Sequence, residues 1–422
     1  MQYIRQLFKL ALFLFTLSWL HPVVLGAAVA LTLFSPPIEN GLFAAALAGA
    51  ATHIARRRLG RLARKPNSHG TARFATVKDI SRAKLFKRKG LLLGRYKGRM
   101  MRYSGDGHLL TFAPTRSGKG VGCVIPNLLT YPGSVVVTDI KGENYALTHT
   151  CRQSLGAVHA LAPMSDHAHK SYYNPLDFIR TGTAYELDDT RLIAEMLVVP
   201  DHTHANHWER EARTLITGML LYLLHHKQSE HHNLGALRDL LMQEEEEFHL
   251  TLTEMATSSH GSIARVASGT LQKETRERSA VISTAQGATE IFESPQLRHI
   301  TRVSSFRLES LKDTTASLYI IIPPEYLDSY RPYLRLMIGL ATAAMTRNQH
   351  KPEQSVLFLL DELPALGYMR PIEDGIGYLA GYGAKLWLFV QDLDQLQKTY
   401  PKARSIIANC AIRQAFNVQD PD

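Results

Sequence analysis

Residues 108–129 join an apolar run to a glycine-rich turn and then to a second apolar stretch. The run "HLLTFA" (108–113) predicts a strand, "PTRSGKG" follows it, and "VGCVIPNLL" (121–129) predicts the start of a helix. A strand, a turn that ends in Gly-Lys and a helix form the context in which a backbone cradles phosphate groups. Two positions depart from the usual G-x-x-x-x-G-K-[ST] pattern, because Ala113 replaces the first glycine and Gly120 replaces the hydroxyl residue. The segment therefore predicts a phosphate-binding loop of altered sequence.

The loop itself supplies the residues expected to contact a nucleotide. They are Thr115, Arg116, Ser117, Gly118, Lys119, Gly120 and Val121. Lys119 would reach the phosphates, and the helix that begins at Gly120 would aim the positive end of its dipole at them. The methyl group of Ala113 is tolerable if its φ is negative. Without a hydroxyl at Gly120, a Mg²⁺ ion would keep an extra water.

Six further apolar runs follow the loop, each bounded by polar or turn residues. They are "SVVVTDI" (134–140), "AVHALAP" (157–163), "SLYIIIPP" (317–324), "SVLFLLDE" (355–362), "AKLWLFVQD" (384–392) and "AIRQAFNV" (411–418). The runs are continuous rather than alternating, which is typical of parallel strands covered on both faces. We therefore predict an α/β nucleotide-binding core with a mainly parallel sheet.

The stretch between "AVHALAP" (157–163) and "SLYIIIPP" (317–324) has a helical period and almost no strand signal. The segment "WEREARTLITGMLLYLLHH" (208–226) carries acids early and histidines late, as helix ends prefer. We predict an inserted all-α domain at 186–301. The nucleotide-binding domain is then formed by two parts of the chain, 107–185 and 302–422.

The N-terminal 55 residues predict a membrane region. Residues 7–34 contain one charge, Lys9, and a helix needs only about 20 apolar residues to cross a bilayer. A second, weaker apolar segment (41–55) ends in a dense Arg/Lys run, which favours a hairpin of two spans with both ends in the cytoplasm. One long tilted span followed by an interfacial helix is the alternative. We assign 1–55 to this transmembrane region.

A basic segment follows, at 56–106. From Arg56 to Arg102 the chain has 17 Lys/Arg and a single acid, Asp79, within a net charge of +10. Such juxtamembrane segments commonly hold topology and bind anionic lipid, and nucleic-acid contact is the alternative. The chain has three cysteines at wide spacing with no C-x-x-C pair, which argues against a disulfide framework and fits a reducing cytoplasm.

An apolar run that ends in two acids supplies the second half of the predicted site. "VLFLLDE" ends in Asp361 and Glu362, which suits Asp361 as the holder of Mg²⁺ and Glu362 as the base that orients the attacking water. This pair and the glycine loop both follow predicted parallel strands, at whose carboxyl ends ligands bind in open α/β sheets. The shared placement predicts an ATPase with ATP and Mg²⁺ as cofactors.

Other polar residues are candidates with open alternatives. Gln391, at the end of "KLWLFVQ", suits a γ-phosphate sensor because an amide can bond phosphate and water at once, but it is equally explained as a strand-end polar residue. Arg413 and Arg404 are candidates for an arginine finger that acts on a neighbouring subunit, and surface or core pairing is the alternative for both. Asp139 is either a supporting residue of the site or a simple turn residue.

The histidines raise the question of a metal site. They gather in "DHTHANHW" (201–208), at His225 and His226, and at His231 and His232. Zinc prefers a fixed helical spacing and the company of cysteine or carboxylate, whereas the spacing here is typical of loops. A metal site is therefore disfavoured by the sequence.

Several segments, in order, resemble the TraG-type conjugal transfer coupling proteins of type IV secretion systems. They are "HGTARFAT" (69–76), "GLLLGRYKG" (90–98), "GDGHLLTFAPTRSGKGVGCVIPNLL" (105–129), "SVVVTDIKGENYALT" (134–148), "NPLDFI" (174–179), "LFLLDELPALG" (358–367) and "FNVQDPD" (416–422). The resemblance includes the same R-S-G-K-G form of the loop, so the altered residues become a marker of the family. Members generally continue past "QDPD", from which we expect that the C-terminal end of the ATPase fold is missing here.

The resemblance implies a RecA-like hexameric ATPase at the bacterial inner membrane, with soluble domains in the cytoplasm. It implies that the protein recruits relaxase-bound single-stranded DNA, or effector proteins, and delivers this cargo to the secretion channel. A membrane-tethered receptor that uses nucleotide only for assembly is the second hypothesis. A chromosome-partitioning translocase is a third, and the stretches "HGTARFAT" and "TDIKGEN" argue against it.

Overall fold

The computed structural model describes residues 73–165, 170–199 and 207–416. The chain divides into two compact units, 1–77 and 78–422, and the account below concerns the second. Over the described ranges, no helix combines the length and the apolar character that crossing a bilayer requires. The membrane region predicted at 1–55 lies outside the described residues.

A seven-stranded parallel sheet forms the centre of this unit, in the order β5-β6-β4-β7-β8-β3-β9. The strands are β3 (His108–Phe112), β4 (Val135–Asp139), β5 (Ala157–Leu161), β6 (Ala316–Ile321), β7 (Val356–Leu360), β8 (Ala384–Val390) and β9 (Cys410–Ala415). Every neighbouring pair is parallel. All seven apolar runs singled out in the sequence form strands, and the α/β prediction is confirmed.

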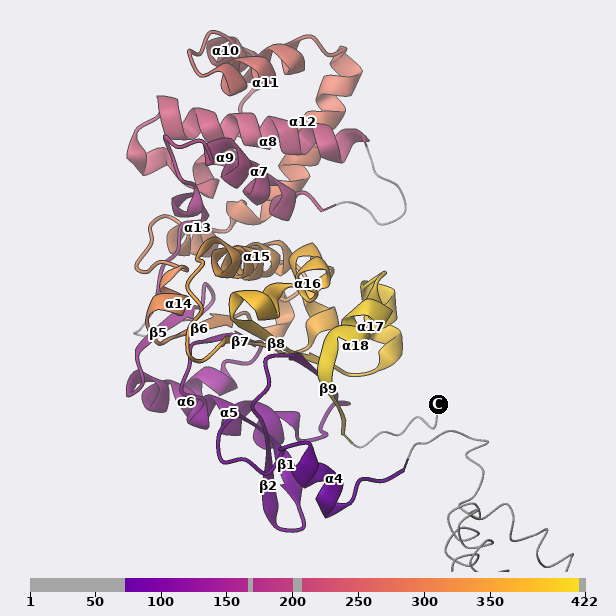
Figure 1. Cartoon of the computed structure of the whole chain (residues 1–422). Helices are drawn as coiled ribbons and strands as arrows, with labels where there is room; N and C mark the ends of the chain where they lie inside the picture. Colours follow the sequence, from indigo (N-terminus) through magenta and orange to yellow (C-terminus); the bar gives the residue numbers. More distant parts are fainter. Residues whose placement is uncertain (1–72, 166–169, 200–206, 417–422) are drawn as a thin grey trace, which may run out of the picture. The chain divides into compact units, whose positions relative to one another are not determined.

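Helices cover both faces of the sheet, which explains why its strands are continuously apolar. In Figure 1, α15 (Arg331–Arg347) and α16 (Arg370–Gly375) lie on one face, and α5 (Ile125–Thr130) and α6 (Glu143–Gln153) on the other. Successive residues of a strand point to opposite faces. Val136 of β4 accordingly packs with the α15 side, and its neighbours Val135 and Val137 pack with the α5 side.

Helices follow one another between β5 and β6, with no strand among the described residues of this stretch. They are α7 (Glu186–Leu197), α8 (His207–His226), α9 (Leu234–Leu241), α10 (Glu245–Ala256), α11 (Gly261–Leu271), α12 (Thr275–Thr289), α13 (Pro295–Ile300) and α14 (Ser310–Asp313). In Figure 1, α7, α8, α10 and α11 lie beyond α15 on the side away from the sheet. The contact between α7 and α15 is close, because a Cβ on Gly339 would meet the sulfur of Met196 at 2.7 Å. The exact domain limits stay a prediction.

Two last helices, α17 (Leu393–Thr399) and α18 (Ala403–Asn409), lead into edge strand β9. The side chain of Asp392 accepts a hydrogen bond from the Gln395 N–H at 2.7 Å, which caps the first turn of α17. Exposed residues alternate with partly buried ones along β9, whereas every residue of β7 and β8 is buried. The alternation is expected of a strand at the edge of a sheet.

A β-hairpin lies inside the segment 56–106, which was predicted only as basic and juxtamembrane. It follows α4 (Val77–Arg82) and consists of β1 (Leu91–Tyr96) and β2 (Arg99–Tyr103), paired antiparallel. Lys97 and Gly98 connect the strands with φ values of 47° and 78°, as a two-residue turn with two left-handed positions requires. The N–H of Leu92 donates to Oδ1 of Asn127 at 2.7 Å, which ties the hairpin to α5.

Buried His108 predicts a loss of stability in acid. Burial lowers the pKa of His108 to about 4 from its ordinary value of 6.5, and Nδ1 accepts a hydrogen bond from the N–H of Leu386 at 3.0 Å. Between these pH values the unfolded chain binds more protons than the folded chain, so stability falls as the pH drops. We expect a loss of roughly 3 kcal/mol between pH 6.5 and pH 4 from this residue.

The measurement is urea unfolding of the full chain across that pH range, beside the variant His108→Asn. Asparagine keeps an acceptor near the Leu386 N–H but does not titrate. The variant is expected to show a smaller pH slope, whatever its stability at neutral pH. Equal pH slopes in the two proteins would show that His108 does not cause the loss of stability in acid.

Candidate nucleotide-binding site

The predicted site residues lie at the carboxyl ends of adjacent strands. β4, β7, β8 and β3 are neighbours in that order. The glycine loop follows β3, Asp361 and Glu362 follow β7, and Gln391 follows β8. The fold therefore brings together residues that are far apart in the chain, at the edge where open α/β sheets bind ligands.

Ala113 is accommodated as part of the sheet. It is buried, and its N–H donates to the carbonyl of Val390 on β8 at 2.8 Å. The left-handed positions of the loop are Arg116 and Gly118, with φ values of 60° and 84°. The methyl group of Ala113 therefore does not occupy a position where glycine is required.

The rest of the loop leaves room and a polar group for a ligand. A Cβ built on Gly118 or Gly120 would have nothing within 4 Å, so local crowding does not explain why Gly120 lacks a hydroxyl. In the described part of the chain, the Oγ atom of Ser117 is buried and has no hydrogen-bond partner. Open backbone beside an orphaned hydroxyl fits a bound phosphate group. Thr115 and Val121 are exposed at the rim.

The helix after the loop differs from the expected one in its first turn. Residues Gly120–Val124 form a π-helical turn, and the α-helix α5 begins only at Ile125. The N–H of Gly122 donates to the carbonyl of Gly118 at 2.8 Å, which closes the loop onto this turn. Single π turns are often found at functional sites.

The ammonium group of Lys119 lies between the two acids. Its Nζ is 2.9 Å from Oδ1 of Asp361 and also pairs with Oε1 of Glu362. Burial opposes the charge of Lys119, but the carboxylate of Asp361 and then that of Glu362 outweigh it and raise the pKa of the lysine. Burial also raises the pKa of Asp361, although Lys119 acts in the opposite direction. Lys119 is thus held in its charged form.

Glu362 is fixed by its backbone and by Gln391. Its φ and ψ are 52° and 47°, a left-handed conformation that costs a residue with a side chain on the order of 1–3 kcal/mol. Its Oε2 accepts a hydrogen bond from Nε2 of Gln391 at 3.0 Å. Strain of this kind is typical of active sites, and here it aims the carboxylate at Lys119 and Gln391.

Thr138 of β4, which was not among the predicted site residues, supports Asp361. The N–H of Asp361 donates to Oγ1 of Thr138 at 2.8 Å, and this hydroxyl lies 3.3 Å from the carbonyl of Asp361. The available signal was the hydroxyl residue before the strand-end acid in "SVVVTDI". Asp139 beside it accepts the N–H of Tyr145 at 2.8 Å, so its carboxylate holds the turn into α6.

Two predicted arginines do not join the cluster within the chain. Arg404 and Arg413 are both exposed. Nε of Arg413 donates to the carbonyl of Ile407 at 3.0 Å, so this side chain is bound to α18 of its own chain. Their suggested action on a neighbouring subunit stays a prediction.

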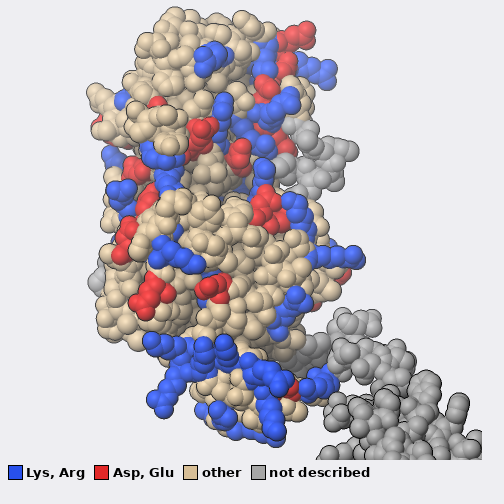
Figure 2. All heavy atoms as spheres, viewed as in Figure 1, with Lys and Arg blue, Asp and Glu red and all other residues tan. Residues whose placement is uncertain are grey.

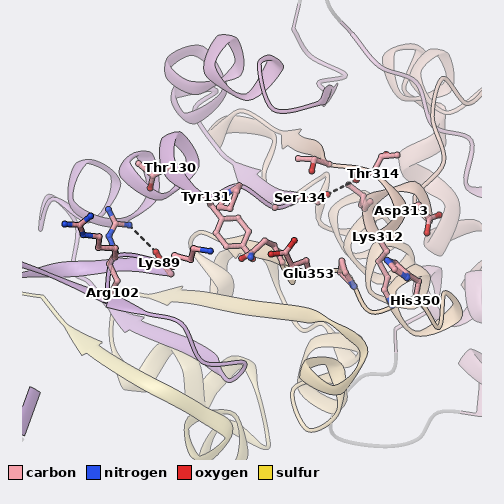
Figure 3. Close-up of a pocket in the computed structure, with 18 residues that line it drawn as sticks. Lys89, Arg102, Thr130, Tyr131, Ser134, Lys312, Asp313, Thr314, His350 and Glu353 are labelled. Atoms are coloured by element: carbon pink, nitrogen blue, oxygen red, sulfur yellow. Dashed lines mark hydrogen bonds between the residues drawn. The ribbon is translucent and has the colours of Figure 1, made fainter. Parts of the chain in front are cut away.

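A cavity of about 610 Å³ opens at the amino ends of the strands, opposite the Lys119 edge. Figure 3 shows Lys89 and Arg102 on one side of it, Tyr131 and Ser134 in the middle, and Lys312 on the other side. Nζ of Lys312 donates to the carbonyl of Met345 at 3.0 Å, and burial lowers the pKa of this lysine. The ammonium group of Lys312 therefore already binds a backbone carbonyl of its own chain.

A charged lysine on the loop after β3, two acids after β7 and an amide after β8, the strand between them, are the parts of a nucleoside triphosphate site. This fold and these residues define a nucleotide-binding α/β protein with a RecA-like core.

The comparison with known proteins places the chain in one family. Residues 73–422 match the family described as type IV secretory system conjugative DNA transfer, and the chain belongs to it. The chain is 31% identical over 393 residues to the conjugal transfer protein TraG of Escherichia coli, a match that covers 82% of the chain and 62% of that protein. It is 29% identical over 375 residues to VirD4 of Rhizobium radiobacter, covering 85% of the chain and 54% of that protein. The chain thus spans less than two thirds of these relatives.

Solved structures of the coupling protein TrwB share the fold. The unbound form of TrwBdeltaN70 aligns with a TM-score of 0.63 at 17% identity, over 80% of this chain and 74% of that one. TrwB in complex with ADP and Mg²⁺ aligns with a TM-score of 0.63 at 16% identity, over 80% and 76%. The likeness supports the RecA-like core with a helical insertion.

Proposed function

We propose that the chain is the ATPase coupling protein of a conjugation or type IV secretion system. The observation that carries the proposal is the cluster of Lys119, Asp361, Glu362 and Gln391 at adjacent strand ends, in a chain of the conjugative DNA transfer family. In this role ATP hydrolysis drives delivery of cargo to the secretion channel. The cluster is charged, hydrogen-bonded and partly buried, which suits catalysis better than nucleotide binding alone.

Each residue of the cluster has a proposed role. Without nucleotide, two carboxylates pair with the ammonium group of Lys119. When ATP binds, the phosphates replace one of these carboxylates as a partner of Lys119. Asp361 holds Mg²⁺. The hydroxyl of Thr138 positions Asp361 by a hydrogen bond with the backbone of Asp361. Glu362 accepts the proton of the attacking water, while Gln391 keeps its carboxylate in place. Bound Mg²⁺ would neutralise charge on the phosphates.

The remaining contacts to the nucleotide come from the loop. Open backbone at Gly118 and Gly120, with Arg116 and the hydroxyls of Thr115 and Ser117, would surround the phosphates. Because Gly120 offers no ligand atom, Mg²⁺ would depend mainly on Asp361 and water. This fits the reluctance of Mg²⁺ to lose its waters.

Proposed partners follow from the family and from the surface of the chain. We propose single-stranded DNA bound to a relaxase as cargo, the secretion channel as acceptor and a homo-hexamer as the active form. Arg413 lies on edge strand β9 and is exposed, so a neighbouring subunit could meet it as an arginine finger. The family description names conjugative DNA transfer, which favours DNA over protein cargo.

The test is an ATP hydrolysis assay on the purified full chain with and without single-stranded DNA. The proposal expects hydrolysis that DNA stimulates. Tight ATP binding without turnover would instead select a membrane-tethered receptor that uses nucleotide only for assembly. If ATP neither binds nor is hydrolysed, the proposal is wrong.

We also propose that the protein is anchored in the inner membrane by two spans in 1–55, and that its basic surface faces the lipid. The basic surface is defined by Lys87, Arg88, Lys89, Arg95, Lys97 and Arg99, all exposed. Figure 2 shows Lys and Arg side chains gathered in this part of the molecule. Its place soon after the apolar segments in the sequence favours anionic lipid as its partner.

Neutralising part of the basic surface is expected to weaken binding to anionic vesicles. In a chain lacking 1–55, the triple variant Arg95→Gln, Lys97→Gln, Arg99→Gln should lose about 10²-fold in affinity, at roughly 1 kcal/mol per charge. Vesicle co-sedimentation at fixed salt is the measurement, since this attraction is screened.

The matched control removes three exposed charges elsewhere, in the variant Arg191→Gln, Arg307→Gln, Lys398→Gln. It should keep most of the affinity. Equal losses in both triple variants would refute a local lipid-facing surface. A loss of DNA binding with unchanged vesicle binding would assign the surface to nucleic acid instead.

A further inference from the structure

Three side chains from distant parts of the helical region converge on one point. Glu186 is the first residue of α7, His225 lies in the last turn of α8, and His260 precedes α11 as its N-cap residue. One ligand atom from each lies within 4.8 Å of the other two. Nε2 of His225 is 2.9 Å from Oε1 of Glu186, and Nε2 of His260 is 3.6 Å from Oε2.

The carboxylate at the centre of the three side chains is buried. Glu186 is 6% exposed, and in the described ranges its ion-pair partners are the two histidines alone. A buried carboxylate requires a compensating charge, and a divalent cation placed among the three side chains would supply it.

The two distances suit a bound ion, although only one of them suits a hydrogen bond: Nε2 of His225 lies at hydrogen-bond distance from Oε1 of Glu186, and His260 does not. The 3.6 Å between His260 and Glu186 is too long for a good hydrogen bond. Ligand atoms around a tetrahedral zinc ion, with bonds of about 2.0–2.1 Å, stand roughly 3.3 Å apart. The two measured separations lie on either side of that value, so small side-chain rotations would complete the geometry.

A backbone hydrogen bond orients the carboxylate of Glu186. The N–H of Gly182 donates to Oε1 of Glu186 at 3.1 Å, and outer hydrogen bonds of this kind commonly orient metal-binding carboxylates. Nδ1 of His260 is buried and, among the described residues, has no hydrogen-bond partner, so the ring is not held by another polar contact. His225 is exposed, which provides an entry side and room for a water ligand.

We propose that Glu186, His225 and His260 bind one Zn²⁺ ion, with water as the remaining ligand. The ion would join the beginning of α7, the end of α8 and the beginning of α11, and so would brace the helical region. The proposal is independent of the nucleotide site, because none of its ligands belongs to the strand ends that carry Lys119, Asp361 and Glu362.

The experiment titrates zinc into the tag-free, chelator-treated full chain and measures binding by calorimetry and thermal unfolding. We expect one Zn²⁺ per chain and a melting temperature raised by zinc, as a ligand of the folded state requires. His260→Gln and, separately, His225→Gln should weaken binding at least about tenfold. The matched control is His249→Gln, which changes an exposed histidine of α10.

The variants also guard against loss of folding. Each must show the melting temperature of the chelator-treated parent before zinc is added, and a second readout, the visible absorption of bound Co²⁺, reports the ligand set directly. Binding that persists in both histidine variants, or that falls equally in the control, overturns the proposal as adventitious binding to surface histidines. The absence of zinc binding to the parent chain overturns it as well.

Discussion

Replacing Glu362 with glutamine is expected to lower kcat for ATP hydrolysis by about 10²–10⁴-fold and to leave ATP binding nearly intact. The amide keeps the size of the side chain but cannot accept the proton of water. Lys119 retains Asp361 as a partner at 2.9 Å, so the loop should remain in place. The measurement is kcat in a steady-state assay together with the ATP affinity of the same preparation.

Lys119→Ala is expected to fail differently. Removal of the ammonium should weaken ATP binding and also lower kcat, by about 10²–10³-fold for one charged stabilising group. It leaves Asp361 and Glu362 facing each other without their shared cation. Lys119→Ala should therefore change both ATP affinity and kcat, whereas Glu362→Gln, which removes only the base, should change kcat alone.

Exposed residues of the same types serve as controls. Glu325→Gln and Lys398→Ala change an acid and a lysine that are exposed and away from the strand ends of the site. Both should hydrolyse ATP at the parental rate. If Glu362→Gln also keeps the parental rate, Glu362 is not the base, and the proposed mechanism fails even if the protein binds ATP.

The sheet and the site were predictable from the sequence because both depend on local patterns. A parallel strand buried on both faces must be apolar along its whole length, so each such run was visible by itself. The carboxyl ends of parallel strands meet at one edge, and the residues that follow them could therefore be expected to meet. Lys119, Glu362 and Gln391 were predicted in this way, and in the structure an ion pair and a hydrogen bond join their side chains.

Other features depend on contacts that no local pattern announces. Strand β1 has only three apolar residues in a row, Leu91, Leu92 and Leu93. Basic residues surround them, so the sequence around the hairpin indicated a charged segment rather than strands. Thr138 matters only because β4 lies beside β7. His225 was considered as a metal ligand and set aside because the spacing of the histidines is typical of loops, whereas the fold brings Glu186 and His260 to it from other helices. Tertiary pairing, rather than spacing, decides all three.

Arg152→Ala is expected to lower the free energy of unfolding by roughly 3–5 kcal/mol. Arg152 is fully buried on α6, and burial lowers its pKa. Its Nη2 donates to the carbonyl of Gly133 at 2.6 Å, its Nε donates to Oγ of Ser317 at 2.8 Å, and Nη1 donates to the carbonyl of Tyr131. Alanine would leave a cavity and buried carbonyls without donors at the amino end of β4. Urea unfolding at pH 7 measures the loss.

Arg152→Met decides whether the hydrogen bonds or the volume matter more. Methionine fills much of the cavity and removes a buried charge, a change that is often nearly neutral when no acid partner is left behind, and no ion pair to Arg152 is present in the described ranges. The carbonyls of Tyr131 and Gly133 would still lose their donor, at about 1–3 kcal/mol each at most. We therefore expect Met to lie between Ala and the parent. If Arg152→Ala lowers the free energy of unfolding no more than Arg152→Met does, cavity volume contributes little. If neither variant is destabilised, the guanidinium does not hold the segment before β4.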